Sequence, residues 1–315
     1  MSSPDGTAPE VGIFLPSMSA SPSVPPGDVV AAGRHAEELG FESVWVVDQL
    51  VAGTGVPVLE SGTVLAAVAG ATSRLRLGFG VMIVPLRPVA WIAKQVASVQ
   101  AVSGGRVLFG AGVGGDRHDL AWEAAGVPKR ERGRRTDAAL RALPGLLAGD
   151  AVRLPDVAGE PEVRLLPGVP VPPILVGGAP GPAGRRLLDL GADAWMAPPL
   201  PVDVLADEVA KLAAAAEERG RPVPGVTAGV LTAMSGDPDL PDADGLHRRL
   251  TDPDGQFGMP AEAVPQLLVR GGTAEVAERF AAYAAAGVDR IVVSLAGGDW
   301  HRQADLVAEA VALLH

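Results

Sequence analysis

The clearest pattern of apolar positions lies in residues 74–115. Residues 75–84 form a nearly continuous apolar run, which is typical of a parallel strand buried on both faces. Prolines end the run, and apolar residues then recur at helical spacing until Gly104-Gly105, where glycine can adopt the left-handed conformation that ends helices. A second apolar run follows at Val107 and leads into several glycines. The segment predicts a strand, a helix and a second parallel strand.

The same alternation continues along the rest of the chain. Apolar runs predict further strands at 11–15, 43–47, 173–176, 193–197, 226–232 and 290–295. Helical spacing predicts helices that begin after an N-cap at Asp28, near Pro57, after Pro88, near Thr136, over 183–190 and 203–219, at a cap on Thr273 and near Asp299. Eight strands alternating with eight helices predict an α/β fold, a TIM (β/α)8 barrel.

Two stretches interrupt this alternation. Residues 150–171 are rich in proline and weakly patterned, and residues 235–272 have no clear period. We expect both to be loop insertions that shape a substrate pocket, the second as a long functional loop or partly mobile lid. The first ten residues are expected to form a disordered tail, and residues 11–315 a single barrel domain.

Composition narrows the possible functions. The 315 residues contain no cysteine, which excludes disulfides, thiolate metal sites, iron–sulfur clusters and cysteine nucleophiles. A net charge of −11 argues against a nucleic-acid partner, and no apolar run is long enough for a membrane helix. The first residues lack the features of a signal peptide, so we expect a cytoplasmic protein. Neither histidine spacing nor any other motif predicts a metal, a serine hydrolase or a P-loop enzyme.

Four segments of residues 74–115 occur in an informative order. They are RLRLGFGV, PLRP, AKQVASVQAVSGGR and LFGAGVGG. Together they resemble the core signature of the bacterial luciferase-like family, which includes flavin monooxygenases and oxidoreductases that use the deazaflavin coenzyme F420. The resemblance extends from Val11 to about Leu314, and it implies a TIM barrel and a homodimer.

The candidate site follows from the barrel, because active sites of TIM barrels lie at the C-terminal ends of the strands. The residues at these predicted ends are Asp48, Gln49, Gly80 to Ile83, Gly112 to Asp116, Gly177, Gly178, Met196 to Pro198 and Ser294.

The resemblance implies a role for the glycines among these residues. Gly80-Val81, followed by Met82, would form a non-proline cis peptide that backs the cofactor ring. Gly112, Gly114 and Gly115 would let a flat tricyclic cofactor pack against backbone. The backbone N–H groups of Gly177-Gly178 would bind its phosphate, with an ordinary β–α turn as the alternative. Two alternatives stay open for GAGVGG: glycines that serve only strand-end turns, and a Rossmann G-x-G-x-x-G motif, which its position after three β–α units disfavours.

The candidate catalytic residues are Asp48, Gln49 and His118. Many deazaflavin-using relatives have Asp-His where this chain has Asp48-Gln49, and an amide orients a substrate but cannot act as an acid or base near pH 7. His118 is the nearest replacement along the sequence, with a surface-loop histidine as the alternative reading. Arg87 either faces an anionic substrate or forms a salt bridge on the rim.

Three hypotheses result. The first is an oxidoreductase that uses coenzyme F420 for hydride transfer to or from a small organic substrate. The second keeps the fold but uses reduced FMN and oxygen as a monooxygenase. The third, motivated by the missing histidine, is a family member that binds a flavin-like ligand, or nothing, without turnover.

Overall fold

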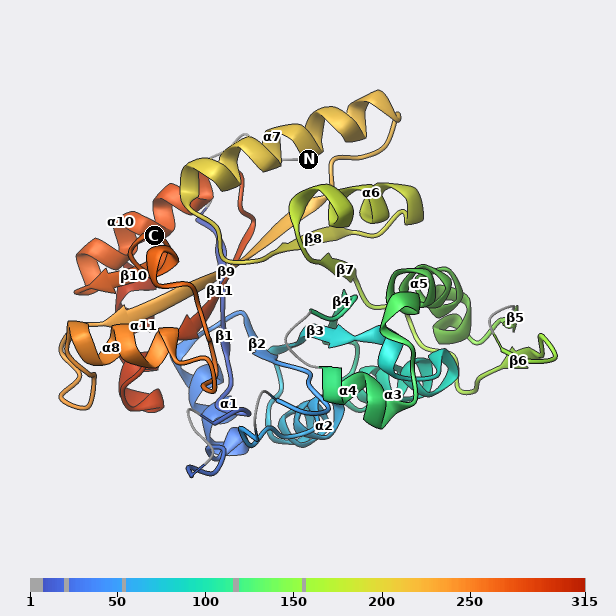
Figure 1. The fold of residues 1–315 in the computed structure, drawn as a ribbon, viewed down its shortest axis with the longest axis horizontal. Helices are drawn as coiled ribbons and strands as arrows, with labels where there is room; N and C mark the ends of the chain where they lie inside the picture. Colours follow the sequence, from blue (N-terminus) through green and yellow to red (C-terminus); the bar gives the residue numbers. More distant parts are fainter. Residues whose placement is uncertain (1–7, 20–22, 53–54, 116–118, 155–156, 315) are drawn as a thin grey trace.

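Eight parallel strands form a closed barrel in the computed structural model, which describes residues 8–19, 23–52, 55–115, 119–154 and 157–314. Each strand pairs in parallel with the next, and the last pairs with the first, which confirms the predicted TIM barrel (Figure 1). In this order the strands are β1 (Glu10–Phe14), β2 (Ser43–Val46), β3 (Arg76–Ile83), β4 (Val107–Gly112), β7 (Ile174–Gly177), β8 (Ala194–Ala197), β9 (Gly225–Met234) and β11 (Arg290–Leu295).

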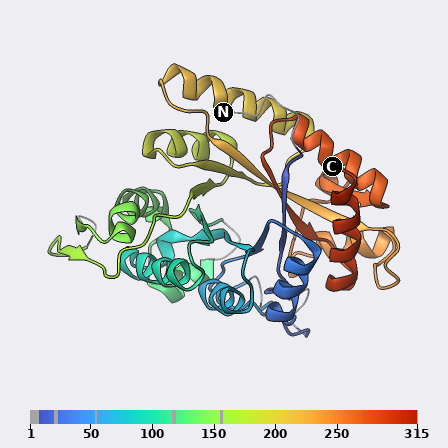
Figure 2. The same cartoon turned by 180° about the vertical axis from the view of Figure 1, so that it is seen from behind.

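The helices that connect these strands lie outside the barrel, as seen from both sides in Figures 1 and 2. They are α1 (Val29–Leu39), α2 (Ser61–Ala71), α3 (Val89–Val102), α5 (Arg132–Ala148), α6 (Pro180–Leu190), α7 (Val202–Glu218), α10 (Thr273–Ala285) and α11 (Trp300–Ala312). A short helix α4 (Asp119–Ala125) and the 3-10 turns η1 (Val84–Leu86) and η2 (Lys129–Glu131) precede α3 and α5. Within the described ranges, no helix is long and apolar enough to cross a bilayer.

The barrel interior is filled by large apolar side chains from several strands. They form one buried cluster, which consists of Trp45, Leu108, Leu175, Met196 and Val292. The Trp45 ring lies against the backbone of β3, since a Cβ placed on Gly78 would come within 2.2 Å of two of its ring carbons. Trp45 Nε1 donates a hydrogen bond to Ser43 Oγ at 2.8 Å, which satisfies the indole inside the core.

An ion-pair group closes the N-terminal end of the barrel. The Arg290 guanidinium on β11 donates to both carboxylate oxygens of Glu42, at 2.9 and 3.0 Å, and to Glu10 on β1. Glu10 therefore belongs to the barrel, and the predicted disordered tail of residues 1–10 extends too far. Residues 1–7 lie outside the described ranges.

Both predicted insertions occur between barrel units, but they contain more structure than expected. The first holds an antiparallel hairpin, β5 (Ala151–Arg153) and β6 (Glu162–Arg164), which projects beside α5 in Figure 1. The second holds α8 (Ala243–Thr251), η3 (Ala261–Ala263), α9 (Val264–Leu267) and β10 (Leu268–Gly271), which extends the sheet beside β9. The second insertion, expected as a long functional loop or partly mobile lid, contains a regular helix because Leu246 and Leu250 bury one face of α8.

Most predicted helix starts are correct within a few residues. Asp28 caps α1 and Asp299 caps α11 through their carboxylates. The helix expected near Pro57 begins later, at Ser61, because Glu60 accepts the N–H groups of Gly62 and Thr63. The one expected near Thr136 begins earlier, at Arg132.

One predicted cap is wrong. Thr273 is the first residue of α10 and makes no capping bond, while Gly272 precedes it as the N-cap.

The close approach of Trp45 and Gly78 predicts a strong effect of a single methyl group. Gly78→Ala should destabilise the chain by about 3 kcal/mol, because the new Cβ overlaps a ring that is fixed inside the barrel. Thermal unfolding should show a melting temperature lower by about 4–5 °C. Gly184→Ala in α6, whose Cβ would meet only Leu212 Cδ1 at 3.6 Å, is the control and should be neutral or stabilising. Equal effects of the two changes would contradict this packing.

Candidate active site

A cavity of about 360 Å³ lies at the C-terminal ends of the barrel strands. Its wall is mainly apolar and comes from the ends of β1, β2, β3, β7, β8 and β11, from the middle of β9 and from the second insertion. The lining residues are Phe14, Leu15, Met18, Val47, Gln49, Gly80, Val81, Gly177, Gly178, Met196, Ala197, Pro198, Pro199, Gly229, Gln256, Phe257 and Ser294. The position of this cavity agrees with the barrel rule used for the sequence.

The end of β3 enters the cavity through the predicted pair of residues. The peptide bond between Gly80 and Val81 is cis, as predicted, and the register of β3 against β4 shifts between Phe79 and Met82. Gly80 and Val81 both line the cavity. Met82 does not, because its side chain returns to the core and is fully buried.

The glycines that follow β4 have a different role from the predicted one. A Cβ on Gly112 would lie 2.4 Å from Val81 Cγ2, so this glycine makes room for the Val81 side chain. Gly114 has a φ of +78° and packs against Trp122 and Ile83, while Gly115 is exposed. None of the three lines the cavity, and Gly112 affects its shape only through the Val81 side chain that packs against it.

Gly177 and Gly178 border the cavity at the end of β7. Gly177 also makes room for Val81, since a Cβ there would lie 2.7 Å from Val81 Cγ1, and Gly178 has a φ of +131°. The chain then enters α6, where Pro180 and Pro182 have no N–H group. The backbone N–H groups of Gly178, Ala179 and Gly181 find no acceptor in the described part of the chain. This edge is therefore suited to an anion.

Asp48, a predicted catalytic residue, lies beneath the cavity wall and not in it. Its side chain is 1% exposed, and its carboxylate accepts hydrogen bonds from Ser61 Oγ at 2.9 Å and the Ile83 N–H at 2.8 Å. Arg87 donates two more through Nη1 and Nη2, at 2.7 and 2.6 Å. With four donors around it, the carboxylate holds the ends of β2 and β3 in place and does not face a ligand.

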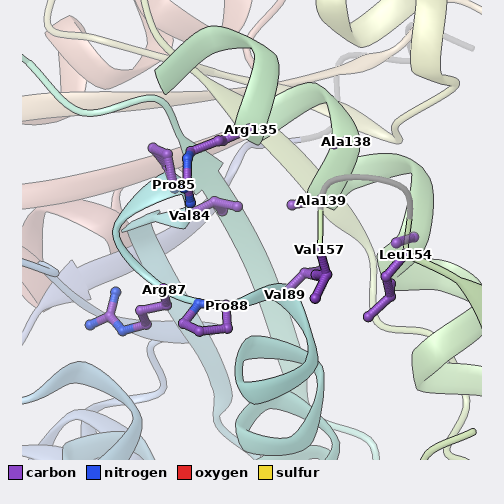
Figure 3. Close-up of a pocket in the computed structure, with 11 residues that line it drawn as sticks. Val84, Pro85, Arg87, Pro88, Val89, Arg135, Ala138, Ala139, Leu154 and Val157 are labelled. Atoms are coloured by element: carbon purple, nitrogen blue, oxygen red, sulfur yellow. The ribbon is translucent and has the colours of Figure 1, made fainter. Parts of the chain in front are cut away.

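Arg87 forms the salt bridge that the sequence offered as one of its two roles. Burial lowers the pKa of its guanidinium, but the hydrogen bonds and charge of Asp48 outweigh burial and keep this pKa above its usual value. Figure 3 shows the neighbouring groove between η1 and α5, where Arg135 extends toward Pro85 and Val84 while the Arg87 guanidinium points away from α5.

Gln49 is the predicted catalytic residue that does reach the cavity. It lines the wall at the end of β2, and its Oε1 atom is buried without a hydrogen-bond donor in the described chain. His118, the other predicted catalytic residue, lies outside the described residues.

Several residues of the wall were not predicted from the sequence. Phe14 is the last residue of β1 and Met18 follows it in the next loop, so the strand-end rule could have found them, whereas Gly229 lies in the middle of β9, where that rule does not apply. Gln256 and Phe257 come from the second insertion, which was expected to shape the pocket but gave no motif. No described residue of the first insertion reaches this cavity.

The described wall contains no Asp, Glu, His, Lys, Tyr or Arg. Its polar side chains are two amides and the hydroxyl of Ser294, none of which gains or loses a proton near neutral pH. Among the described residues, no three His, Asp or Glu side chains are grouped as a metal site. The wall can bind and orient a molecule, but the chemistry has to come from what it binds.

The contacts of Asp48 predict strong coupling to Arg87. Arg87→Met should cost about 3 kcal/mol of stability because it leaves a buried carboxylate unpaired. Asp48→Asn should also destabilise, and the double variant should recover about 2 kcal/mol relative to the sum of the single changes. Chemical denaturation of the four proteins measures this coupling. The exposed pair Glu208–Lys211, with Nζ 2.6 Å from Oε1, is the control and should show no measurable coupling, and additive effects at Asp48 and Arg87 would refute the arrangement.

Known proteins resemble this chain in sequence over about half of its length. An uncharacterized protein of Mycobacterium tuberculosis is 37% identical over 175 residues, which cover 54% of this chain and 58% of that protein. The F420-dependent glucose-6-phosphate dehydrogenase of Beutenbergia cavernae is 30% identical over 177 residues, 54% of this chain and 52% of the dehydrogenase. The match thus spans little more than half the length of these relatives.

The fold also matches solved structures over nearly its whole length. The structure of an F420-dependent secondary alcohol dehydrogenase in complex with an F420-acetone adduct has a TM-score of 0.79 at 16% identity, and the match covers 98% of this chain and 100% of that chain. Residues 10–251, from β1 to the end of α8, match the model of the luciferase-like monooxygenase family. The chain belongs to the luciferase-like monooxygenase family.

Proposed function

We propose that this chain is an oxidoreductase that binds the deazaflavin coenzyme F420 in the barrel cavity and transfers hydride to or from a small organic substrate. The observation that carries the proposal is one continuous wall in which an apolar shelf, Gly80-Val81, and an anion-binding edge, Gly177-Gly178, flank the same cavity. A deazaflavin has a flat ring and a phosphate on its side chain, and these two features fit such a wall.

The residues present fit this cofactor. Val81, Met196 and Pro198 offer apolar surface to a ring, and the N–H groups at the start of α6 are available to a phosphate. When bound, the cofactor supplies the hydride chemistry. The chain contributes binding, the exclusion of water by its apolar wall, and orientation of the substrate by Gln49.

Two alternatives use the same wall. The first is a monooxygenase that uses reduced FMN and oxygen, as the name of the family suggests. Backbone contacts to a ring and a phosphate would serve FMN as well as F420. The glutamine at position 49 favours a member that binds a flavin-like ligand without turnover. The F420-dependent dehydrogenase of Beutenbergia cavernae supports the deazaflavin.

Ligand fluorescence can distinguish these alternatives. Titration of the protein into F420 or FMN should give a saturable change with F420 and a much weaker one with FMN. Gly181→Asp should weaken F420 binding at least tenfold, because it adds a negative charge beside the phosphate site in a position with open space. Gly181→Asn is the uncharged control. Binding of FMN alone would refute the deazaflavin, and equal affinities of both variants would refute the phosphate position.

The homodimer implied by the resemblance stays a proposal, and the surface of α2 and α3 supports it. Residues 61–71 contain no charge, Ala66, Ala67 and Gly70 of α2 are exposed, and Trp91 at the start of α3 is 71% exposed. An uncharged exposed helix face is typical of an interface. Trp91→Glu should therefore shift the protein from dimer to monomer in analytical ultracentrifugation, and Leu313→Glu, which is also at an exposed site, should not. A monomeric native protein would contradict the proposal.

A further inference from the structure

A groove lined by charged side chains lies between α5 and α6, on the outside of the barrel (Figure 1). Its volume is about 210 Å³, and the charged residues that line it are Asp137, Arg141, Arg185, Arg186 and Asp189. The three from α6 recur at helical spacing with Pro182, so they share the face of α6 that borders the groove. Asp137 and Arg141 lie one turn apart on α5. The groove is therefore built by the faces of two regular helices.

The charges in this groove are only partly paired. The Arg186 guanidinium donates to the Asp137 carboxylate across the groove, which joins α6 to α5. Arg141 and Arg185 are exposed, and neither side chain makes an ion pair or a hydrogen bond with the described residues. Asp189 is exposed and likewise unpaired within those ranges. Two available cations thus face one available anion, in a chain whose net charge is −11.

The groove begins where the anion-binding edge of the cavity ends. The N–H groups that are available to a phosphate belong to Gly178, Ala179 and Gly181. Pro182, the next residue, borders the groove. Arg185 follows Gly181 by four residues, which is about 6 Å along the helix axis. A molecule whose phosphate lies at the start of α6 can therefore reach the arginines with the group that it carries next.

The chemistry of the cofactor supplies such a group. In coenzyme F420 the phosphate is followed by a lactyl unit and a chain of glutamates, and each glutamate keeps a free carboxylate. Guanidinium groups bind carboxylates through two parallel hydrogen bonds, which lysine cannot reproduce. FMN ends at its phosphate and has nothing to place in the groove.

We propose that the groove between α5 and α6 binds the glutamate chain of F420, and that Arg141 and Arg185 pair with its carboxylates. The inference rests on the proposed function, because it takes the cofactor phosphate to lie at the start of α6. Arg186 fixes the two helices to each other, since Asp137 already holds its charge. The groove then provides a preference for F420 over FMN that backbone contacts to a ring and a phosphate cannot provide.

Two forms of the cofactor, one without glutamates and one with several, test the inference on the full-length protein. In fluorescence titrations at low ionic strength, the long form should bind about fivefold more tightly, and high salt should remove this preference because exposed charges are screened. The double change Arg141→Gln and Arg185→Gln should also remove it and leave the affinity for the short form unchanged. Arg34→Gln, at an exposed position of α1, is the control and should keep the preference.

A variant with the opposite effect guards against damage to the fold. Asp189→Asn removes the carboxylate that opposes the glutamate chain, so the preference for the long form should rise about twofold. Persistence of the preference in the double arginine variant would overturn the inference. Weaker binding of the short form to that variant would overturn it as well, because the arginines would then serve the phosphate.

The same titrations separate this inference from the proposed function. If the native protein binds both forms with equal affinity, the assignment of the groove fails and the proposed function stands. If it binds neither form, both fail.

Discussion

The Asp48 carboxylate is the interaction on which the geometry of the cavity depends. It joins the end of β2 to the Ile83 N–H at the end of β3, to Ser61 at the start of α2 and to Arg87 beyond η1. The cis Gly80-Val81 bond and Gln49 lie immediately beside two of these points. A buried carboxylate with four donors is held in a single orientation, so the wall that presents Val81 and Gln49 is fixed before any ligand binds.

The barrel could be predicted from the sequence because parallel strands buried on both faces give long apolar runs that glycines and prolines separate clearly. Residues 75–84 are the best example, and even the cis bond followed once the resemblance was recognised. The helix α8 within residues 235–272 could not be predicted, because it is short and charged and its two buried leucines do not make a visible period. The predicted cap at Thr273 was wrong by one residue, because a threonine before an apolar run gives the same sequence pattern at the N-cap and at the first position of the helix.

The candidate site was predicted in part, and the errors have one cause. The strand-end rule gives the position of a residue along the strand, but not whether its side chain enters the cavity or lies behind its wall. Asp48 and Gln49 are adjacent in the sequence but differ in their surroundings. The Asp48 carboxylate lies beneath the wall and accepts four hydrogen bonds, whereas Gln49 lies in the wall and its Oε1 atom has no donor in the described chain. Gly112 and Gly177 likewise both pack against Val81, but only Gly177 also borders the cavity. These differences depend on partners that are distant in the sequence, so no local pattern contains them.

The second insertion packs in a small core that lies apart from the main core of the barrel but includes residues of a barrel strand. Leu246, Leu250 and Val264 of the insertion join Leu231 and Ala233 of β9 there, and Phe257 packs against this core while lining the cavity. The part of the wall that Gln256 and Phe257 provide is therefore supported by packing that the insertion and a barrel strand have in common. In evolutionary terms, a lineage can reshape this part of the cavity only through substitutions that β9 also tolerates.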